Sequence, residues 1–184
     1  KWILRGGRVL NPAPFCLIGI VNVTPDSFSD GGKYIDPRNA VAHGLRLLDE
    51  GAGMLDLGAE STRPFAEPVP EGEEIARLMP VVARLREQRP DAVLSVDTLK
   101  AGTARAALEG GADIINDVSA CVADPALLDV LAEYKPGYVL MHSQGSPREM
   151  QVNPRYGNVV EEILAFFEEH LARLVKAGLP LDAE

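Results

Sequence analysis

Polar side chains that could do chemistry recur along this chain, each directly after a short apolar run. They are Asn22, Glu60, the pair Asp97 and Thr98, the pair Asn116 and Asp117, and His142. Groups of these types exchange protons and hold polar ligands in enzyme sites. Taken singly, an Asn or Asp after a strand often caps the next helix or fixes a turn. Because every apolar run is followed by such a residue, the polar residues together indicate one catalytic site.

Two loops between these runs are long and rich in turn-forming residues. Residues 24–32 combine Pro, Asp and Gly with a single aromatic side chain, Phe28. Residues 61–70 bring Arg63 beside the hydroxyls of Ser61 and Thr62, which suits a phosphate-bearing ligand. Long ordered loops are often lids over active sites. The plainer alternatives are an ordinary surface connection for each loop and a surface ion pair for the Arg.

The apolar runs that must position these groups have the length of buried strands. They are apolar on both faces, which is typical of parallel strands covered by helices. The predicted strands are residues 16–23, 54–58, 93–96, 114–115 and 138–141.

An amphipathic helix is predicted after each strand. Asp36 and Pro37 open the first, which ends at Gly51; residues 71–89, 100–109 and 158–177 form the second, third and fifth; Asp124 and Pro125 open the fourth. Pro80 predicts a kink or a break in the second helix. The fifth helix is predicted to bury an apolar face and to end at Gly178; the face comprises Val160, Ile163, Leu164, Phe167, Leu171, Leu174 and Val175.

Five β-then-α units in series fit either an open doubly wound sheet or part of a (β/α)8 barrel. No G-x-G-x-x-G and no Walker loop follows the first strand, which removes the main support for the dinucleotide and NTP sheets. A complete barrel typically needs about 250 residues. We therefore expect residues 1–184 to be one α/β domain, the first five units of a TIM barrel truncated at its C-terminus, with residues 1–10 as a small hairpin.

Composition excludes several function classes. The 184 residues carry 18 Lys and Arg against 27 Asp and Glu, a formal charge of −9. This negative charge argues against binding to nucleic acid and against a polybasic membrane anchor. No secretory leader or bilayer-spanning run is visible, and Cys16 and Cys121 are interpreted as two buried thiols of a cytoplasmic protein.

Two long motifs resemble the signatures of the dihydropteroate synthase family. Residues 18–32, IGIVNVTPDSFSDGG, are similar to the first signature, and residues 56–64, DLGAESTRP, to the second. The segments around Asp97, Asn116 and His142 resemble the third, fourth and fifth strand ends of that family. Ala120 and Ser143 stand where the family commonly has Gly and Met, and its sixth- to eighth-strand motifs have no counterpart in this sequence.

The resemblance implies a pterin-binding TIM barrel and a transferase of folate biosynthesis. The family condenses 6-hydroxymethyl-7,8-dihydropterin pyrophosphate with p-aminobenzoate to give 7,8-dihydropteroate and pyrophosphate, with Mg²⁺ as cofactor. It further implies a cytoplasmic homodimer that sulfonamides inhibit, with small-molecule substrates as its partners.

The resemblance also implies a role for each motif residue. Asp97 would bind the pterin and stabilise the positive charge that develops as pyrophosphate leaves. Asn116 would bind the pterin, and Asn22 would offer its carbonyl oxygen to Mg²⁺. Thr62 and Arg63 would contact pyrophosphate, Phe28 and Pro64 would line the p-aminobenzoate pocket, and Asp30 would help to close the site.

Plainer roles stay open for the same residues. Asn22 could brace the turn that follows it, Asp97 could pair with Lys100, and Asn116 could bond the backbone of a neighbouring strand. Asp117 is interpreted as structural, since adjacent strand residues point to opposite faces. His142 is interpreted either as structural or as a residue that supports the site without touching the ligand. The alternative functions are a methyltetrahydrofolate:corrinoid methyltransferase and a non-catalytic pterin-binding paralogue. The two long loops favour the synthase.

Overall fold

Five parallel strands form one sheet in chain order in the computed structural model, which describes residues 1–24, 36–60, 68–145, 150 and 153–180. The strands are β3 (Ile18–Asn22), β4 (Met54–Gly58), β5 (Leu94–Asp97), β6 (Ile114–Asp117) and β7 (Gly137–Leu140). Each pairs with the next in parallel register, so their carboxyl ends meet at one edge of the sheet. The five predicted strands are confirmed to within three residues at each end.

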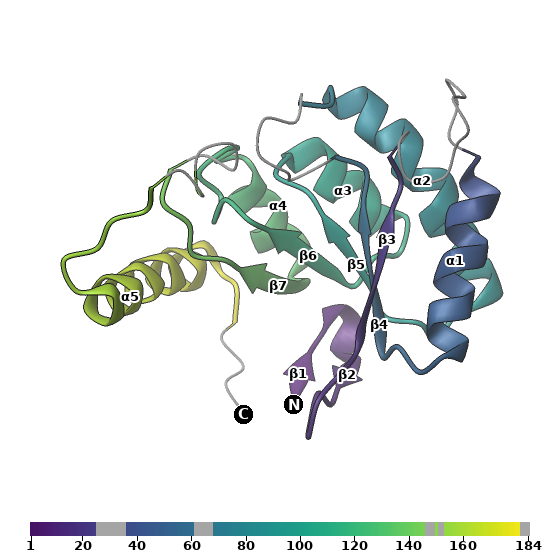
Figure 1. The fold of residues 1–184 in the computed structure, drawn as a ribbon, viewed down its shortest axis with the longest axis horizontal. Coiled ribbons are helices and arrows are strands. Elements are labelled where there is room, and N and C mark those ends of the chain that lie inside the picture. The colour runs from purple at the N-terminus through teal and green to yellow at the C-terminus, as the bar shows by residue number, and fades with distance from the viewer. Residues whose placement is uncertain (25–35, 61–67, 146–149, 151–152, 181–184) are drawn as a thin grey trace.

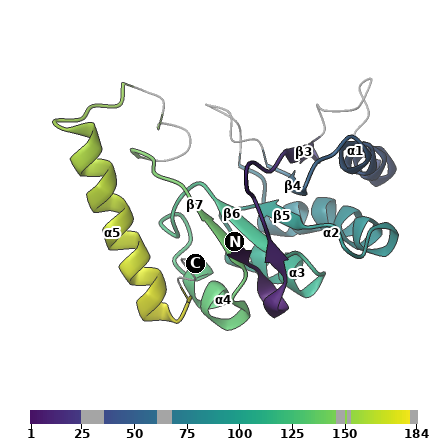
Figure 2. The same cartoon turned by 90° about the horizontal axis from the view of Figure 1, so that it is seen from below.

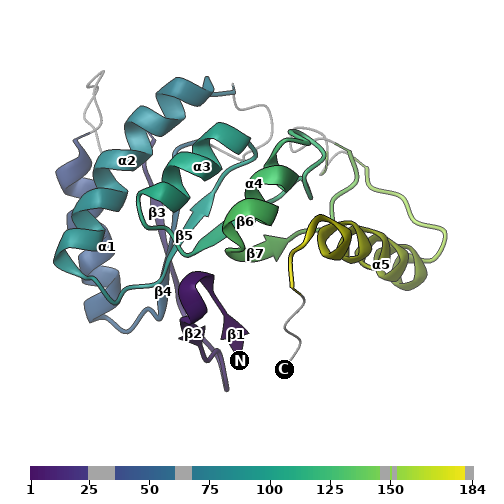
Figure 3. The ribbon, with the colours of Figure 1, turned by 180° about the vertical axis from the view of Figure 1, so that it is seen from behind.

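One helix follows each strand, as the sequence predicts. The helices are α1 (Pro37–Asp49), α2 (Glu71–Gln88), α3 (Ala101–Glu109), α4 (Leu127–Tyr134) and α5 (Val159–Ala177). Helices α1 to α4 pack along one face of the sheet (Figure 1), and Figure 3 shows α2, α3 and α4 in front of the strands. In the parts of the chain that the structure describes, no helix is both long and apolar enough to cross a bilayer.

Local signals account for several of the helix ends. The Asp36 carboxylate caps α1 by accepting from the Arg38 backbone N–H, and the Asn158 side chain caps α5 in the same way. Gly178 ends α5 with a φ of 104°, a conformation that a side chain would strain. Of the kink or break predicted at Pro80, the break is wrong, because α2 is a single element from Glu71 to Gln88.

Asp124 caps a different helix from the one the sequence indicates. A turn follows Pro125, and α4 begins only at Leu127. One Asp124 oxygen accepts from the Ala126 N–H, and the other accepts at 2.8 Å from the N–H of Ala101, the first residue of α3. The residue thus joins the start of α3 to the turn before α4, a link that only the tertiary structure reveals.

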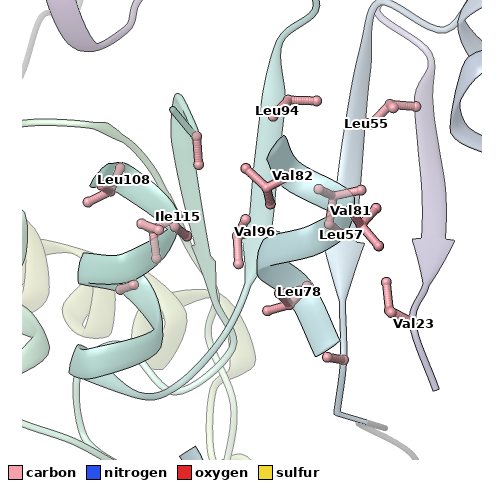
Figure 4. Close-up of a cluster of buried hydrophobic side chains, with 14 of the residues drawn as sticks. Val23, Leu55, Leu57, Leu78, Val81, Val82, Leu94, Val96, Leu108 and Ile115 are labelled. Carbon is pink, nitrogen blue, oxygen red and sulfur yellow. The ribbon is translucent and has the colours of Figure 1, made fainter. Parts of the chain in front are cut away.

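The main core lies between the sheet and helices α1 to α4. The outward side chains of the strands, among them Leu57, Val96 and Ile115, are completely buried against Leu78 and Val82 of α2 and their neighbours (Figure 4). Burying a side chain of this size contributes about 2 kcal/mol. This layer fixes the sheet on which the strand-end residues stand.

The predicted burial of the α5 apolar face is largely wrong. Of the seven predicted side chains, only Leu174 is buried, whereas Val160, Leu164 and Val175 are exposed. Helix α5 stands beside the sheet rather than against it (Figure 2). Periodicity identifies the apolar face of a helix correctly, but it does not say what covers that face.

The predicted N-terminal hairpin is confirmed. Strands β1 (Trp2–Ile3) and β2 (Val9–Leu10) pair antiparallel around the short 3-10 helix η1 (Arg5–Gly7). Leu4 packs against Met54, Val93 and Ile114 at the amino ends of the sheet strands. The hairpin therefore covers the end of the sheet opposite to the strand-end polar groups.

Candidate active site

Three of the predicted site residues lie in one row across the carboxyl edge of the sheet. The register aligns Asn22 of β3 with Gly58 of β4, Gly58 with Asp97 of β5, and Asp97 with Asn116 of β6. Residues in one row of a parallel sheet point to the same face. Because the residues next to them in the strands face the helices, Asn22, Asp97 and Asn116 share the face that the helices leave open.

The remaining predicted site residues are in the two long loops. Phe28, Asp30, Thr62, Arg63 and Pro64 all lie outside the described residues, so their predicted roles stay predictions.

Gly58 leaves space in the row between Asn22 and Asp97. A Cβ atom at Gly58 would lie 3.7 Å from both Cβ and Oδ2 of Asp97. A larger side chain would therefore cover the Asp97 carboxylate. The glycine keeps this carboxylate accessible from the neighbouring strand.

Asp56 is a site residue that the sequence analysis missed. It lies two residues before Gly58 in β4, in the neighbouring row on the same face of the sheet, where the register aligns Ile20, Asp56, Ser95 and Ile114. The Ser95 hydroxyl donates to Asp56 Oδ1 at 2.6 Å, and the Asn116 side-chain amide donates to Asp56 Oδ2 at 3.0 Å. The signal was present in the sequence, because Asp56 is the one acid inside a run otherwise treated as apolar.

The contact with Asp56 determines which end of the Asn116 side chain meets a ligand. An ionised carboxylate only accepts hydrogen bonds, so the NH₂ group of Asn116 must face Asp56. The carbonyl oxygen of Asn116 and the second proton of its NH₂ group remain for other partners. The alternative that Asn116 bonds a neighbouring strand backbone is not what the structure shows.

Asp97 carries an unusually basic carboxylate. Burial, together with the nearby acidic groups Asp56, Glu74, Asp117 and Glu60, raises the pKa of Asp97 from 3.8 to about 7. No donor in the described part of the chain makes a hydrogen bond to this carboxylate. An acid with a strongly shifted pKa and no internal donor is typical of a functional site, where a ligand supplies N–H donors or positive charge.

Lys100 pairs with two glutamates rather than with Asp97, so that alternative is wrong. Its ammonium group contacts Glu60, at the end of β4, and lies 2.8 Å from Glu74 of α2. Burial opposes the charge of Lys100, but the hydrogen bonds to Glu60 and Glu74 outweigh it and raise the pKa of Lys100. Glu60 also accepts from the Val69 N–H at 3.4 Å, so this cluster joins both flanks of residues 61–67.

Lys100→Met is expected to lower the free energy of unfolding by about 3 kcal/mol, because it leaves the completely buried Glu74 without its cation. Urea denaturation measures the change. Arg46→Met is the control, because it breaks the exposed pair of Arg46 with Glu50 and should change stability by less than about 0.5 kcal/mol. A double variant, Lys100→Met with Glu74→Leu, should recover most of the loss; no recovery would contradict the assigned cause.

Asp117 and His142 both have structural surroundings. Asp117 is fully buried on the helix side, where its carboxylate accepts from Ser119, from the Cys121 N–H and from the Tyr138 hydroxyl. The His142 ring packs edge-on against Phe166 of α5, with 4.8 Å between ring centroids. Neither contact places the side chain in the row of Asn22, Asp97 and Asn116.

Comparison with known proteins identifies the family. The sequence profile described as "Pterin binding enzyme" matches residues 18–183, which is most of the chain. The chain belongs to the pterin-binding enzyme family. Within it, the dihydropteroate synthase of Mycobacterium leprae is 45% identical over 168 residues, covering 91% of this chain and 58% of that protein. The resemblance drawn from the motifs is thereby confirmed.

Solved structures of family members share the fold. A Yersinia pestis dihydropteroate synthase, in a sulfonamide drug complex, superposes with a TM-score of 0.88 at 41% identity, covering 98% of this chain and 65% of its own. The Xanthomonas albilineans enzyme with 4-aminobenzoic acid superposes with a TM-score of 0.86 at 44% identity, covering 98% and 64%. Another structure of that enzyme holds 7,8-dihydropteroate, with a TM-score of 0.80, 42% identity and coverage of 96% and 62%. The chain thus spans under two thirds of the length of the relatives it matches.

Proposed function

We propose that the protein containing this chain is a dihydropteroate synthase. It would join 6-hydroxymethyl-7,8-dihydropterin pyrophosphate to p-aminobenzoate and release pyrophosphate. The observation that carries the proposal is the row of Asn22, Asp97 and Asn116 at the carboxyl edge of the sheet, in a chain of the pterin-binding enzyme family. The 45% identity to a named synthase supports this activity over others of the family.

Asp97 and Asn116 would bind the pterin ring from neighbouring strands. The side-chain carbonyl oxygen of Asn116 would accept from an N–H of the ring, and the Asp97 carboxylate would do the same. As pyrophosphate leaves, positive charge spreads from the methylene carbon into the ring, and ionised Asp97 would stabilise it. The aryl amine of p-aminobenzoate then attacks the methylene carbon.

Asn22 fits a magnesium site that the substrate completes. In the part of the chain that the structure describes, no cluster of three or more acidic, His or Cys groups forms a metal cage. Mg²⁺ usually binds through one or two protein oxygens, substrate phosphates and water, and the exposed Asn22 offers one such oxygen. When bound, Mg²⁺ would neutralise the charge of the leaving pyrophosphate.

The two long loops, residues 24–32 and 61–70, would supply the contacts to pyrophosphate and p-aminobenzoate. We assign Thr62 and Arg63 to pyrophosphate, and Phe28 and Pro64 to the wall of the p-aminobenzoate pocket, from the family motifs that contain them. The proposal also includes one barrel domain for residues 1–184, a cytoplasmic homodimer and inhibition by sulfonamides. The last is supported by the sulfonamide complex of the Yersinia pestis relative.

The experiment that tests the proposal is pyrophosphate release by the full-length protein. The pterin pyrophosphate and Mg²⁺ are supplied with and without p-aminobenzoate, and dihydropteroate is quantified in parallel. We expect release that depends on p-aminobenzoate and matches dihydropteroate one for one. Tight pterin binding without turnover would contradict the synthase activity and favour a methyltransferase or a binding paralogue.

The activity is expected to depend on pH through Asp97. Because its pKa is about 7, the carboxylate is mostly protonated below pH 7 and ionised above it. The ionised form stabilises the developing charge, so kcat/KM should fall about tenfold per pH unit below 7 and level off above 8. Binding of 6-hydroxymethylpterin, which carries no phosphate, is measured over the same range to separate Asp97 from titration of the substrate. A flat profile between pH 5.5 and 8 would contradict the role of Asp97.

A further inference from the structure

Asp56 is a half-buried acid for which no cationic partner lies among the described residues. In the described residues, Asp113 pairs with Arg8 and Arg86, and Glu74 pairs with Lys100. The side-chain partners of Asp56 are instead neutral, the Ser95 hydroxyl and the Asn116 amide. A half-buried carboxylate without a counter-charge loses part of its hydration, and this one also raises the pKa of the neighbouring Asp97. Because Asp56 does not stabilise the fold through an ion pair with any described residue, its presence in the sheet calls for a functional explanation.

The consequence of this arrangement is a fixed orientation of Asn116. If its amide rotated by half a turn, the Asn116 oxygen would face the Asp56 carboxylate, and two acceptors would oppose each other without a proton between them. The other oxygen of Asp56, Oδ1, accepts from the Ser95 hydroxyl at 2.6 Å, so this bond does not involve Asn116. The carbonyl oxygen of Asn116 is therefore locked away from Asp56, on the sheet face that carries Asp97.

We propose that Asp56 is a specificity-determining residue: it orients Asn116 so that its carbonyl oxygen and the Asp97 carboxylate together select a heterocycle that presents N–H donors. This inference rests on the proposed function, because the heterocycle is a pterin. A 2-amino-4-oxo pterin presents an NH₂ donor at position 2. A 2,4-dioxo lumazine presents an acceptor oxygen there and is rejected, since Asn116 cannot turn its NH₂ group to meet it.

The test compares two ligands whose substituents differ only at position 2; the oxo group of the lumazine is accompanied by a proton on N1. Binding of 6-hydroxymethylpterin and 6-hydroxymethyllumazine to the full-length protein is measured by calorimetry at pH 8, where Asp97 is ionised. Asp56→Asn keeps the shape but can pair with either end of the Asn116 amide. We expect the preference for the pterin to fall about tenfold or more in this variant.

Ser95→Ala is the matched control. It removes the other hydrogen bond to Asp56 but leaves the contact between Asp56 and Asn116. Its ligand preference should stay within about twofold of the unsubstituted protein. A merely structural role of Asp56 would lower the melting temperature without changing the ratio of the two affinities.

A second variant keeps the inference testable if Asp56→Asn does not fold. The double variant Asp56→Asn with Asn116→Asp reverses the hydrogen bond, keeps the net charge and still directs an acceptor oxygen towards the ligand. It should retain the preference for the pterin. An unchanged preference in Asp56→Asn, or a lost one in the double variant, overturns the inference and leaves the proposed function standing. Absence of pterin binding in the unsubstituted protein overturns both.

Discussion

Asp97→Asn is expected to abolish dihydropteroate formation and, at pH 8, to make the folded protein more stable. The loss of activity follows from removing the charge that faces the developing cation, and a 10²- to 10³-fold or larger fall in kcat is of the size such groups supply. The gain in stability follows from the surroundings of Asp97, where burial and neighbouring acids oppose its negative charge.

The sign of the stability effect comes from the two pKa values. The pKa of Asp97 is about 7 in the folded protein and 3.8 in the unfolded chain, so folding favours the protonated acid. The contribution of protonated Asp97 to the free energy of unfolding is fully present below pH 4 and is lost as the pH rises through 7. At pH 8 the burial of the ionised carboxylate costs about 4 kcal/mol, which the neutral Asn avoids.

Urea denaturation at pH 5 and pH 8 measures this difference. Asp97→Asn should gain stability over the unsubstituted protein mainly at pH 8. Glu168→Gln, which neutralises an exposed acid on α5, should change stability by less than about 0.5 kcal/mol at both values. If Asp97→Asn is instead less stable at pH 8, the carboxylate has a favourable partner in the folded protein and the assigned pKa shift is wrong.

Asp117→Asn is expected to lower the free energy of unfolding by about 2–4 kcal/mol. The Asp117 carboxylate holds the turn after β6, where Ala120 and Cys121 have positive φ values of 55° and 57°. It accepts at 2.6 Å from the Cys121 N–H and at 2.7 Å from the Ser119 N–H. An amide places an NH₂ group against one of these donors and leaves buried hydrogen-bonding groups unpaired.

The measurement is again chemical denaturation, with Asp129→Asn on the exposed side of α4 as the matched control. Hydrogen exchange of the Ser119 and Cys121 amides should become faster in Asp117→Asn well before global unfolding. Binding of 6-hydroxymethylpterin should change far less than in Asp97→Asn, because Asp117 faces the helices. A stability change below about 0.5 kcal/mol would show that the turn does not depend on this carboxylate.

The secondary structure was predictable because its signals are local. Strand-length apolar runs, the Asp36 cap and the Gly178 stop act within a few residues, and the structure bears out the strands and helices that they indicate. The failures at Pro80 and on the apolar face of α5 have a common cause. Whether a helix continues through a proline, and what covers an apolar face, depend on packing against residues distant in sequence.

The sequence by itself determined the family, the five βα units and the three strand-end residues Asn22, Asp97 and Asn116, since parallel strands deliver successive polar groups to one edge. Only the tertiary structure decided what each group faces. The register placed Asp56 beneath Asn116, directed Lys100 to Glu60 and Glu74, and surrounded Asp97 with acids. These interactions join residues 20 to 60 positions apart, and their energies depend on distance and burial, which spacing along the chain does not specify.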